Sequence, residues 1–450
     1  MRSLQARLLA PTDIAPLAWF RLVFGVTMVV EVFRYFSRGW IKSYYIEPSF
    51  FFSYYGFDWV KPWPGDWMYV HFAALGVLGA MIAAGFSYRV ATPLFWLGVT
   101  YVFLLDQTQY LNHMYLVCLL AFLLIWLPGG GAFALDARLG LARPRDTVPT
   151  WMLWLVRAQI GLVYFFGGIA KLESDWLSGV PGSMFLRGWE LTEPLAGHEW
   201  AARAFALSGA AFDLLVVPGL LWPRSRPWAI GAVLVFHLTN VQLFRIGIFP
   251  WLMLAVTPIF LEPATVRRWL ERWWPWRTPR AVAAPVSPRW QRAGLAFLGL
   301  WLALQCLLPL RHWFYPGEVN WTEEGHNFSW HMKLRNKEGR VRFHARDPRT
   351  GARWKVDPRP LLSNRQYQKM STRPDMVQQF AHELARRYER EGRPGLEIYA
   401  DMRVSLNGRP RQMLVDEDAD LAAQPWTWRA ASWLVPLGDE PLVFSRVVEP

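Results

Sequence analysis

Long runs of apolar residues, separated by short polar segments, fill the first two thirds of the chain. Nine of these runs have the composition of helices that enter a lipid bilayer. They cover residues 14–36, 68–86, 92–105, 114–127, 151–171, 200–222, 228–244, 246–261 and 293–310. Several are shorter than the roughly 20 residues that a full span prefers, so tilted or re-entrant segments also fit the pattern. The pattern predicts a polytopic α-helical membrane protein with about nine transmembrane segments.

The pattern changes after residue 310. Residues 330–334, 341–345 and 396–404 alternate as strands do, and Asn407-Gly408 is a strong hairpin signal. Residues 374–392 have the period of a helix with a charged outer face. We therefore predict a transmembrane domain over residues 1–310 and a compact, mostly-β outer domain with one helix over residues 311–450.

Arginines gather in the loops that this topology places on one side of the membrane. With a cytoplasmic N-terminus, the inner loops hold Arg89 and the arginines of residues 138–145, 224–226 and 267–292, as the positive-inside rule requires. The net charge of +13 therefore reflects topology and the polar tail, and it does not indicate a nucleic-acid partner. The residues after 310 then lie outside, and the C-terminal domain is predicted to be periplasmic or lumenal. Four basic residues fall outside against the trend, namely Arg38, Lys42, Lys61 and Arg187.

Composition supports the membrane interpretation. Of 450 residues, 53 % are hydrophobic and only 18 % are charged, and 28 are tryptophan. Both cysteines, Cys118 and Cys306, lie inside apolar runs, where a thiol behaves as a small hydrophobe. We expect neither a disulfide framework nor a metal-thiolate site. The first apolar run is too long for a cleavable signal peptide and is interpreted as the first membrane helix.

One apolar helix, in the stretch RAQIGLVYFFGGIAKLESDW at residues 157–176, carries unusual polar groups. At helical spacing one stripe holds Arg157, Gly161, Tyr164, Gly168 and Lys171. Its glycines leave room for a neighbouring helix or a flat ligand. A lysine held there would lose hydration and have its pKa depressed, which makes it a usable base. The alternative is a lysine that extends to the lipid head groups.

Three polar groups lie at the same predicted depth. They are Lys171 with Glu173 and Asp175, the stretch DQTQYLNH at residues 106–113, and His237 with Asn240 and Gln242. Each alone would be interpreted as a packing residue, but intramembrane polar groups that converge indicate a site. No spacing supports a metal site, a phosphate loop or a nucleophile elbow. A base beside an aromatic cavity suits a lipophilic ring substrate such as a quinol.

Four segments carry a resemblance to a known family. RAQIGLVYFFGGIAKLESDW, FLLDQTQYLNHMYL, FHLTNVQLFRIGIFPWLML and VNWTEEGHNFSWHMK resemble, in order and separation, segments of vitamin K-dependent gamma-glutamyl carboxylase. Its microbial relatives are grouped as horizontally transferred transmembrane (HTTM) domain proteins. The resemblance implies a carboxylase of the carbon-carbon lyase type with epoxidase activity. A lysine deprotonates vitamin K hydroquinone, reaction with O2 yields a strongly basic alkoxide and then the epoxide, and the base removes a glutamyl γ-proton so that the carbanion captures CO2.

The resemblance also implies roles for individual residues. Lys171 and His113 would be catalytic, and Asn112, His237 and Asn240 would bind the quinol. Glutamyl substrate binding would fall to Arg187, Trp321, Ser329 and Trp330. For these four the alternatives are a folded-domain tryptophan core and a surface arginine. The segment HNFSW-HMK departs from the YGYSW-DMM of the animal enzymes, so the substrate-facing wall differs.

Expected partners are the bilayer, a glutamyl peptide or protein and a quinone or epoxide reductase, and no metal is expected. The expected location is a bacterial inner membrane, or the endoplasmic reticulum membrane in a eukaryote. Two other functions fit the same cavity. One is a quinol oxygenase that makes the epoxide without carboxylating glutamate, and the other is a non-catalytic lipid- or quinone-binding protein.

Overall fold

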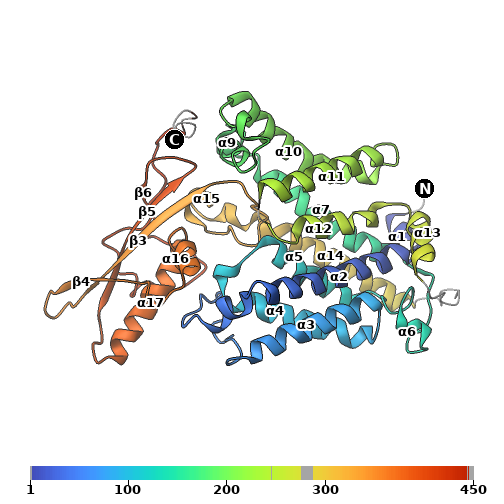
Figure 1. Ribbon diagram of the computed structural model, residues 1–450, viewed down its shortest axis with the longest axis horizontal. Helices are drawn as coiled ribbons and strands as arrows, with labels where there is room; N and C mark the ends of the chain where they lie inside the picture. Colours follow the sequence, from blue (N-terminus) through green and yellow to red (C-terminus); the bar gives the residue numbers. More distant parts are fainter. Residues whose placement is uncertain (1–2, 245, 275–286, 443, 445–450) are drawn as a thin grey trace.

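Helices that run side by side form one end of the molecule, and a sheet-containing domain covers the other (Figure 1). The computed structural model describes residues 3–244, 246–274, 287–442 and 444. The N-terminal helix α1 (Leu4–Leu9) lies at the end of the bundle opposite to the sheet (Figure 1). The predicted arrangement, with the N-terminus and the C-terminal domain on opposite sides of a membrane, fits this geometry.

Six helices of the described residues are long and apolar enough to cross a membrane. They are α2 (Ala15–Ser37), α3 (Trp67–Ala84), α4 (Tyr88–Leu105), α7 (Thr150–Ala170), α10 (Glu199–Leu221) and α14 (Pro288–Leu310). The other three predicted runs contain α5 (Asn112–Trp126), α11 (Arg226–Leu243) and α12 (Phe249–Val256).

The prediction of nine spans is not confirmed, because α5 and α12 are too short and α11, which contains His237, Asn240 and Gln242, is not apolar enough. At 1.5 Å per residue, α5 extends only about 22 Å and α12 about 12 Å, against a hydrocarbon core of about 30 Å. The segment 249–260 is followed by α13 (Pro263–Trp273) at an angle of 116°, and the pair counts as one broken or re-entrant span at most. That gives six or seven spans in the part of the chain described. Arg277 and Arg280 of the predicted inner loop lie outside the described residues.

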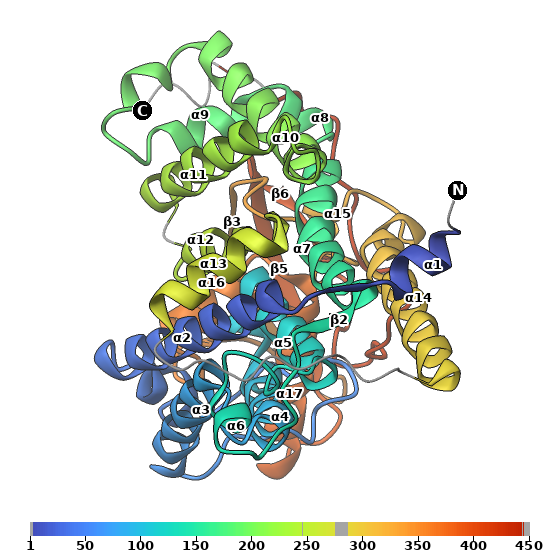
Figure 2. The same ribbon diagram turned by 90° about the vertical axis from the view of Figure 1, so that its right-hand side faces the viewer.

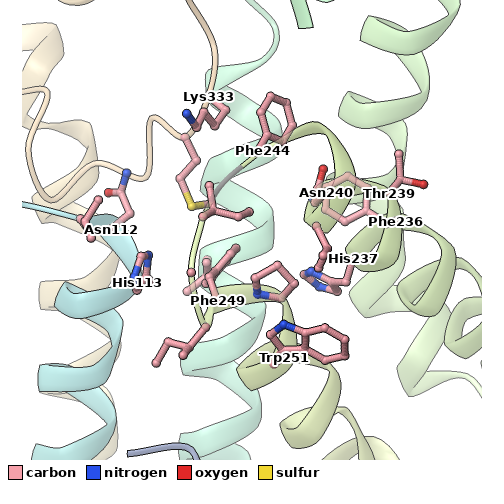
Figure 3. A pocket seen from close by; sticks show the side chains of 18 of the residues that line it. Asn112, His113, Phe236, His237, Thr239, Asn240, Phe244, Phe249, Trp251 and Lys333 are labelled. Atoms are coloured by element: carbon pink, nitrogen blue, oxygen red, sulfur yellow. The ribbon is translucent and has the colours of Figure 1, made fainter. Parts of the chain in front are cut away.

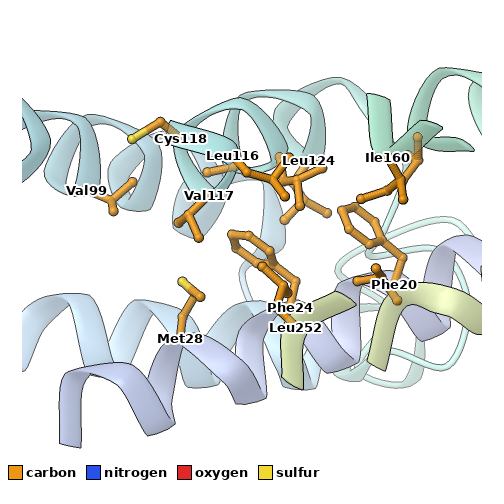
Figure 4. Close-up of a cluster of buried hydrophobic side chains, with 14 of the residues drawn as sticks. Phe20, Phe24, Met28, Val99, Leu116, Val117, Cys118, Leu124, Ile160 and Leu252 are labelled. Carbon is orange, nitrogen blue, oxygen red and sulfur yellow. The ribbon is translucent and has the colours of Figure 1, made fainter. Parts of the chain in front are cut away.

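The bundle has a continuous apolar core (Figure 4). Phe20, Phe24 and Met28 of α2 face Leu116 and Val117 of α5 across it. Two small residues let α3 approach closely on the other side of α2, because a Cβ at Gly25 would lie 2.5 Å from the carbonyl oxygen of Gly79. Helix α5 packs in turn along α4, and its first turn carries Asn112 and His113.

The C-terminal domain is an antiparallel sheet with two helices and, before the first strand, the single helical turn α15 (Val319–Thr322). The strands β3 (Lys337–Arg346), β4 (Arg353–Val356), β5 (Glu397–Leu406) and β6 (Gln412–Met413) have the spatial order β4-β3-β5-β6. The helices are α16 (Asn364–Met370) and α17 (Pro374–Arg390). Buried residues alternate along β5, and Phe343 packs on Phe380 of α17 with ring centroids 5.2 Å apart.

Four predictions for this domain are confirmed and two are wrong. The predicted strands at 341–345 and 396–404 correspond to β3 and β5. Helix α17 is present, and Asn407 and Gly408 turn the chain between β5 and β6 with φ of 54° and 80°. The domain is not mostly β, because a capping box at Ser363 begins a second helix and the helices match the strands in extent. Residues 330–334 do not form a strand, since Trp330 and Lys333 have φ of 61° and 51°, outside the extended region.

The acidic segment after α7 joins the two domains. Asp175 accepts hydrogen bonds from Arg409 Nη1 (2.6 Å) and Nη2 (2.8 Å) and from Asn407 Nδ2 (2.8 Å). Burial opposes the charge of Asp175, but the bonds from Arg409 and Asn407 outweigh it and lower the pKa of the carboxyl. Glu173 contacts Asn320, and burial with Glu318 and Asp175 nearby raises the pKa of Glu173 to about 8. Both acidic side chains bond to residues of the outer domain, and the predicted grouping of Glu173 and Asp175 with Lys171 is not formed.

Arg409→Ala is expected to lower stability by about 3 kcal/mol, because it leaves a nearly buried carboxylate without its bidentate partner. The pair's contribution should be complete above the pKa of an unfolded aspartate, near 4. It should be lost as the pH falls through the lower pKa of the folded state. Thermal unfolding in detergent, from pH 3 to 7, measures both effects. The matched control is Arg403→Ala, which breaks a half-exposed pair with Asp401 and should cost less than about 1 kcal/mol. Equal losses of stability in the two variants would contradict the conclusion that the Arg409–Asp175 pair holds the two domains together.

Candidate active site

A cavity of about 1350 Å³ lies between the helices and the outer domain. Its walls come from α2, α5, α7, α10, α11 and α12, and residues of the C-terminal domain line its outer end. This volume exceeds the roughly 300–1000 Å³ typical of small-molecule sites. Five of the nine predicted site residues line it, namely Asn112, His113, Lys171, His237 and Asn240.

Lys171 forms a buried ion pair that the sequence analysis missed. The residue follows the last turn of α7, and its Nζ lies 2.5 Å from Asp213 Oδ2 of α10 and 3.3 Å from the carbonyl oxygen of Gly167. The two side chains are only 8 % and 4 % exposed. Asp213 supplies the opposite charge without which a buried ammonium would be costly. A lone aspartate in an apolar run was the available signal, because such residues are rare in membrane helices.

Glycines bring the two helices close enough for this pair. A Cβ at Gly168 would lie 2.7 Å from Leu214 Cγ, and one at Gly167 would lie 3.2 Å from Asp213 Oδ2. The glycines of α7 thus leave room for a neighbouring helix, as the stripe indicates. Arg157, on the same predicted stripe, does not line the cavity. It donates to the carbonyl oxygens of Ile259 (2.9 Å) and Leu261 (3.2 Å).

Two histidines face the cavity from different helices (Figure 3). His113 and His237 lie on opposite sides of Phe249, each with its ring centroid 6.1 Å from that of Phe249. His237 Nε2 shares a hydrogen bond of 2.7 Å with the Tyr164 hydroxyl, and its buried Nδ1 has no partner among the described residues. An unpartnered buried polar atom in a cavity wall is suited to a ligand hydroxyl.

Asn112 connects the cavity to the outer domain. Its Nδ2 donates to the carbonyl oxygen of His331 (3.2 Å), and its Oδ1 accepts from the Tyr110 hydroxyl (2.9 Å). Asn240 lies on α11, beside His237 (Figure 3). Their amide groups contribute polar atoms to a wall that is otherwise largely aromatic and aliphatic.

The four predicted substrate-binding residues do not line the cavity. Trp321 is in the core of the outer domain and donates to the Val435 carbonyl (2.8 Å). Ser329 Oγ bonds to the carbonyl oxygen of Gly325 (2.6 Å), and Trp330 packs on Tyr115. Arg187 is exposed after α9 (Val180–Leu186). Their role in substrate binding stays a prediction.

The outer end of the cavity is basic instead. Six basic side chains line the cavity against two acidic ones, Glu31 and Asp213, and both acids are paired, with Arg34 and Lys171. The outer domain contributes the basic rim, which we define as Lys333, Arg365 and Lys369. None of these three has an ion pair with another described residue. An excess of positive charge attracts anionic ligands.

Burial lowers the pKa of Lys333 and, with Arg373 and Arg365 nearby, lowers that of Lys369 to about 8. Lys369 is therefore mostly charged at pH 7 and mostly neutral above pH 9. The rim has no signal in the sequence, because its three members are ordinary basic residues of a polar domain and only the fold brings them to the cavity.

Comparison with protein families gives two matches. The HTTM domain family matches residues 9–264, and the lumenal domain of vitamin K-dependent gamma-carboxylase matches residues 290–440. The first match spans more than half of the chain and contains the five predicted residues that line the cavity. The second contains the sheet, α16 and α17. No solved structure matches the chain.

Proposed function

Since the chain belongs to the HTTM domain family and carries a vitamin K-dependent gamma-carboxylase lumenal domain, we propose that it converts glutamyl residues to gamma-carboxyglutamate. The reaction would be coupled to epoxidation of vitamin K hydroquinone by O2. The two family matches and the apolar helices together indicate a multi-pass membrane enzyme of the carboxylase type with a lumenal domain. The buried Lys171–Asp213 pair, in the wall of a cavity large enough for a quinol, is the observation that carries the specific reaction.

The cavity suits the quinol ring. Its walls include Phe212, Phe236 and Phe249, and the free Nδ1 of His237 is available to a ring hydroxyl. Oxidation of the quinol by O2 supplies a base strong enough to remove a glutamyl γ-proton, which no side chain could do. A largely apolar wall limits the water that would quench such a base.

Lys171 would act as the first base. When Asp213 takes the ammonium proton across the 2.5 Å contact, Lys171 is left as a neutral amine and the pair stays neutral. The amine lone pair then accepts the proton of a quinol hydroxyl. The resulting ammonium lies beside the quinol oxygen and stabilises its negative charge. His113 and Asn112, in the same cavity, would orient the ring.

The basic rim would receive the acceptor. A glutamyl side chain carries one carboxylate and its product carries two, and the rim offers cations with no counter-ion among the described side chains. The rim belongs to the outer domain, where a secreted peptide would arrive. Lipophilic and anionic reactants could thus meet in one cavity.

The test is a carboxylation assay. Membranes that contain the protein receive a glutamyl peptide, labelled bicarbonate and reduced vitamin K, and both fixed label and epoxide are measured. We expect both products in comparable amounts. Epoxide without fixed label would identify a quinol oxygenase of the same fold instead. Absence of both products, with quinone binding intact, would indicate a non-catalytic binding protein.

Lys369→Ala is expected to raise the KM for the glutamyl peptide about tenfold with little change in kcat, because a hydrogen bond to a charged group contributes about 1.5–3 kcal/mol. In the wild type the KM should also rise above about pH 8, where Lys369 loses its proton. Lys369→Arg should restore the KM and remove its rise with pH. Lys355→Ala, at an exposed position of β4, is the control. A KM that is insensitive to charge at position 369 would remove the rim from substrate binding.

A further inference from the structure

One side of the cavity is apolar and open to the surface. Val26 and Val30 of α2, Val235 of α11 and Trp251 of α12 all line the cavity. The same four side chains are 49 %, 48 %, 66 % and 53 % exposed. A residue that both lines a cavity and is half-exposed lies at an opening. We call these four residues the side opening.

The side opening lies in the middle of the membrane-spanning part. Val26 is eleven residues from either end of the 23-residue helix α2, which is about 16 Å at 1.5 Å per residue. Val235 is near the middle of the 18-residue helix α11, which packs on the candidate membrane span α10. Lipid chains surround a membrane protein at that depth. The side opening therefore faces hydrocarbon, whereas the basic rim belongs to the outer domain.

The packing of the helices leaves this side uncovered. Helix α2 packs on α3, α12 and α13, whereas α11 packs on α10 and α12. Helix α12 thus lies between α2 and α11 (Figure 2). Helix α12 is only eight residues long. The chain then bends by 116° between the segment 249–260, which contains α12, and α13. A short helix fills less of the gap than a full span would.

An aromatic path leads from the side opening to the ion pair. Phe236, next to Val235, stacks on Phe212 with ring centroids 3.9 Å apart. Phe212 precedes Asp213 in α10 and lies 5.8 Å from the Tyr164 ring. The wall between the side opening and Lys171 is therefore largely aromatic. Its Tyr164 hydroxyl is already paired with His237 Nε2 at 2.7 Å, so a hydrocarbon chain that lies along Phe236 and Phe212 has few polar groups to desolvate.

We propose that the side opening between α2 and α11 is the way from the bilayer into the cavity, and that it holds the hydrocarbon side chain of a ligand whose ring lies beside Lys171. The identity of the ring rests on the proposed function. The chain stays among Val26, Val30, Val235 and Trp251 and continues into the lipid, so its length is not limited by the cavity. The ligand class is a quinol or quinone with a long isoprenoid chain, which never has to cross the outer domain. The anionic acceptor takes the separate route past the basic rim.

The test replaces valines of the side opening by tryptophan, which narrows it, and measures the binding of ligands with and without a hydrocarbon chain. Val30→Trp and Val235→Trp in lipid nanodiscs are compared by equilibrium binding of two labelled probes, a naphthoquinone with a four-isoprenoid chain and 2-methyl-1,4-naphthoquinone, which has no chain. We expect the Kd of the chain-bearing probe to rise at least about tenfold, and that of the chain-free probe to change less than about twofold. Val77→Trp, equally bulky and exposed on α3 but outside the cavity, should leave both Kd values unchanged.

A second variant guards against misfolding. Val30→Cys, treated after folding with a bulky apolar thiol reagent, should reproduce the selective loss, and reduction should reverse it. Equal effects on both probes, no effect on either, or no binding of the chain-bearing probe to the wild type would overturn the proposal. Chain-selective binding in a protein that fixes no labelled bicarbonate would leave the side opening in place and contradict only the glutamyl carboxylation.

Discussion

Lys171→Arg is expected to lower the rate of epoxide formation by at least about 1000-fold and to leave the fold intact. The guanidinium stays protonated at every working pH, so it cannot accept the proton of a quinol hydroxyl. It can still pair with Asp213, since both residues are buried and their charges are opposite. Loss of activity would therefore report the missing base rather than a missing ion pair. Rates of epoxide formation and the thermal midpoint in detergent, measured on one preparation, separate the two.

Arginine is a sharper substitution than alanine at this position. Lys171→Ala leaves the Asp213 carboxylate buried without a partner, which costs about 3–5 kcal/mol and could remove activity through misfolding. Lys337→Arg is the matched control, because Lys337 is also a buried lysine paired with a carboxylate, Glu323 at 2.8 Å, but lies outside the cavity. Epoxide formed by Lys171→Arg at more than about a tenth of the wild-type rate would exclude Lys171 as the base.

Asp213→Asn is expected to lower kcat for quinol oxidation by about 100-fold, the low end of what positioned proton transfer contributes. Asparagine keeps the shape of the side chain but cannot take the ammonium proton. The pH–rate profile of the wild type should therefore show a limb that belongs to the pair, and this limb should move or vanish in the variant. A residue that only supported the fold would lower the amount of active protein without changing the shape of that profile.

Two variants control for structural effects at Asp213. Asp213→Glu retains a carboxylate and should recover much of kcat together with the wild-type profile. Asp175→Asn removes a buried carboxylate from the domain junction, and it should lower the thermal midpoint without altering the profile. If Asp213→Asn and Asp175→Asn had the same signature, Asp213 would be a structural partner only.

The outcome at individual residues shows what hydrophobic pattern can predict. All nine apolar runs contain helix, because backbone groups in an apolar stretch must bond within their own segment. The pattern does not say which helices complete a crossing. Helix α12 ends at Val256, just before Pro258, and the chain bends by 116° before α13, which begins at Pro263. Residues 330–334 alternate like a strand, yet positive φ angles at Trp330 and Lys333 turn the chain toward the cavity instead.

The sequence by itself determined that an apolar bundle carries polar residues at one depth, and the cavity contains Asn112, His113, Lys171, His237 and Asn240. Polar side chains are costly in hydrocarbon and therefore rare in apolar helices, so a single sequence reveals them without any knowledge of contacts. Only the tertiary structure decided what each one faces. Asp213 pairs with a lysine 42 residues earlier in the chain, and Lys369 reaches the cavity from a separate domain. Trp321, for which the resemblance implies substrate binding, lies in the core of the outer domain. Such partnerships depend on the packing of helices and domains, and local periodicity contains no information about packing between distant segments.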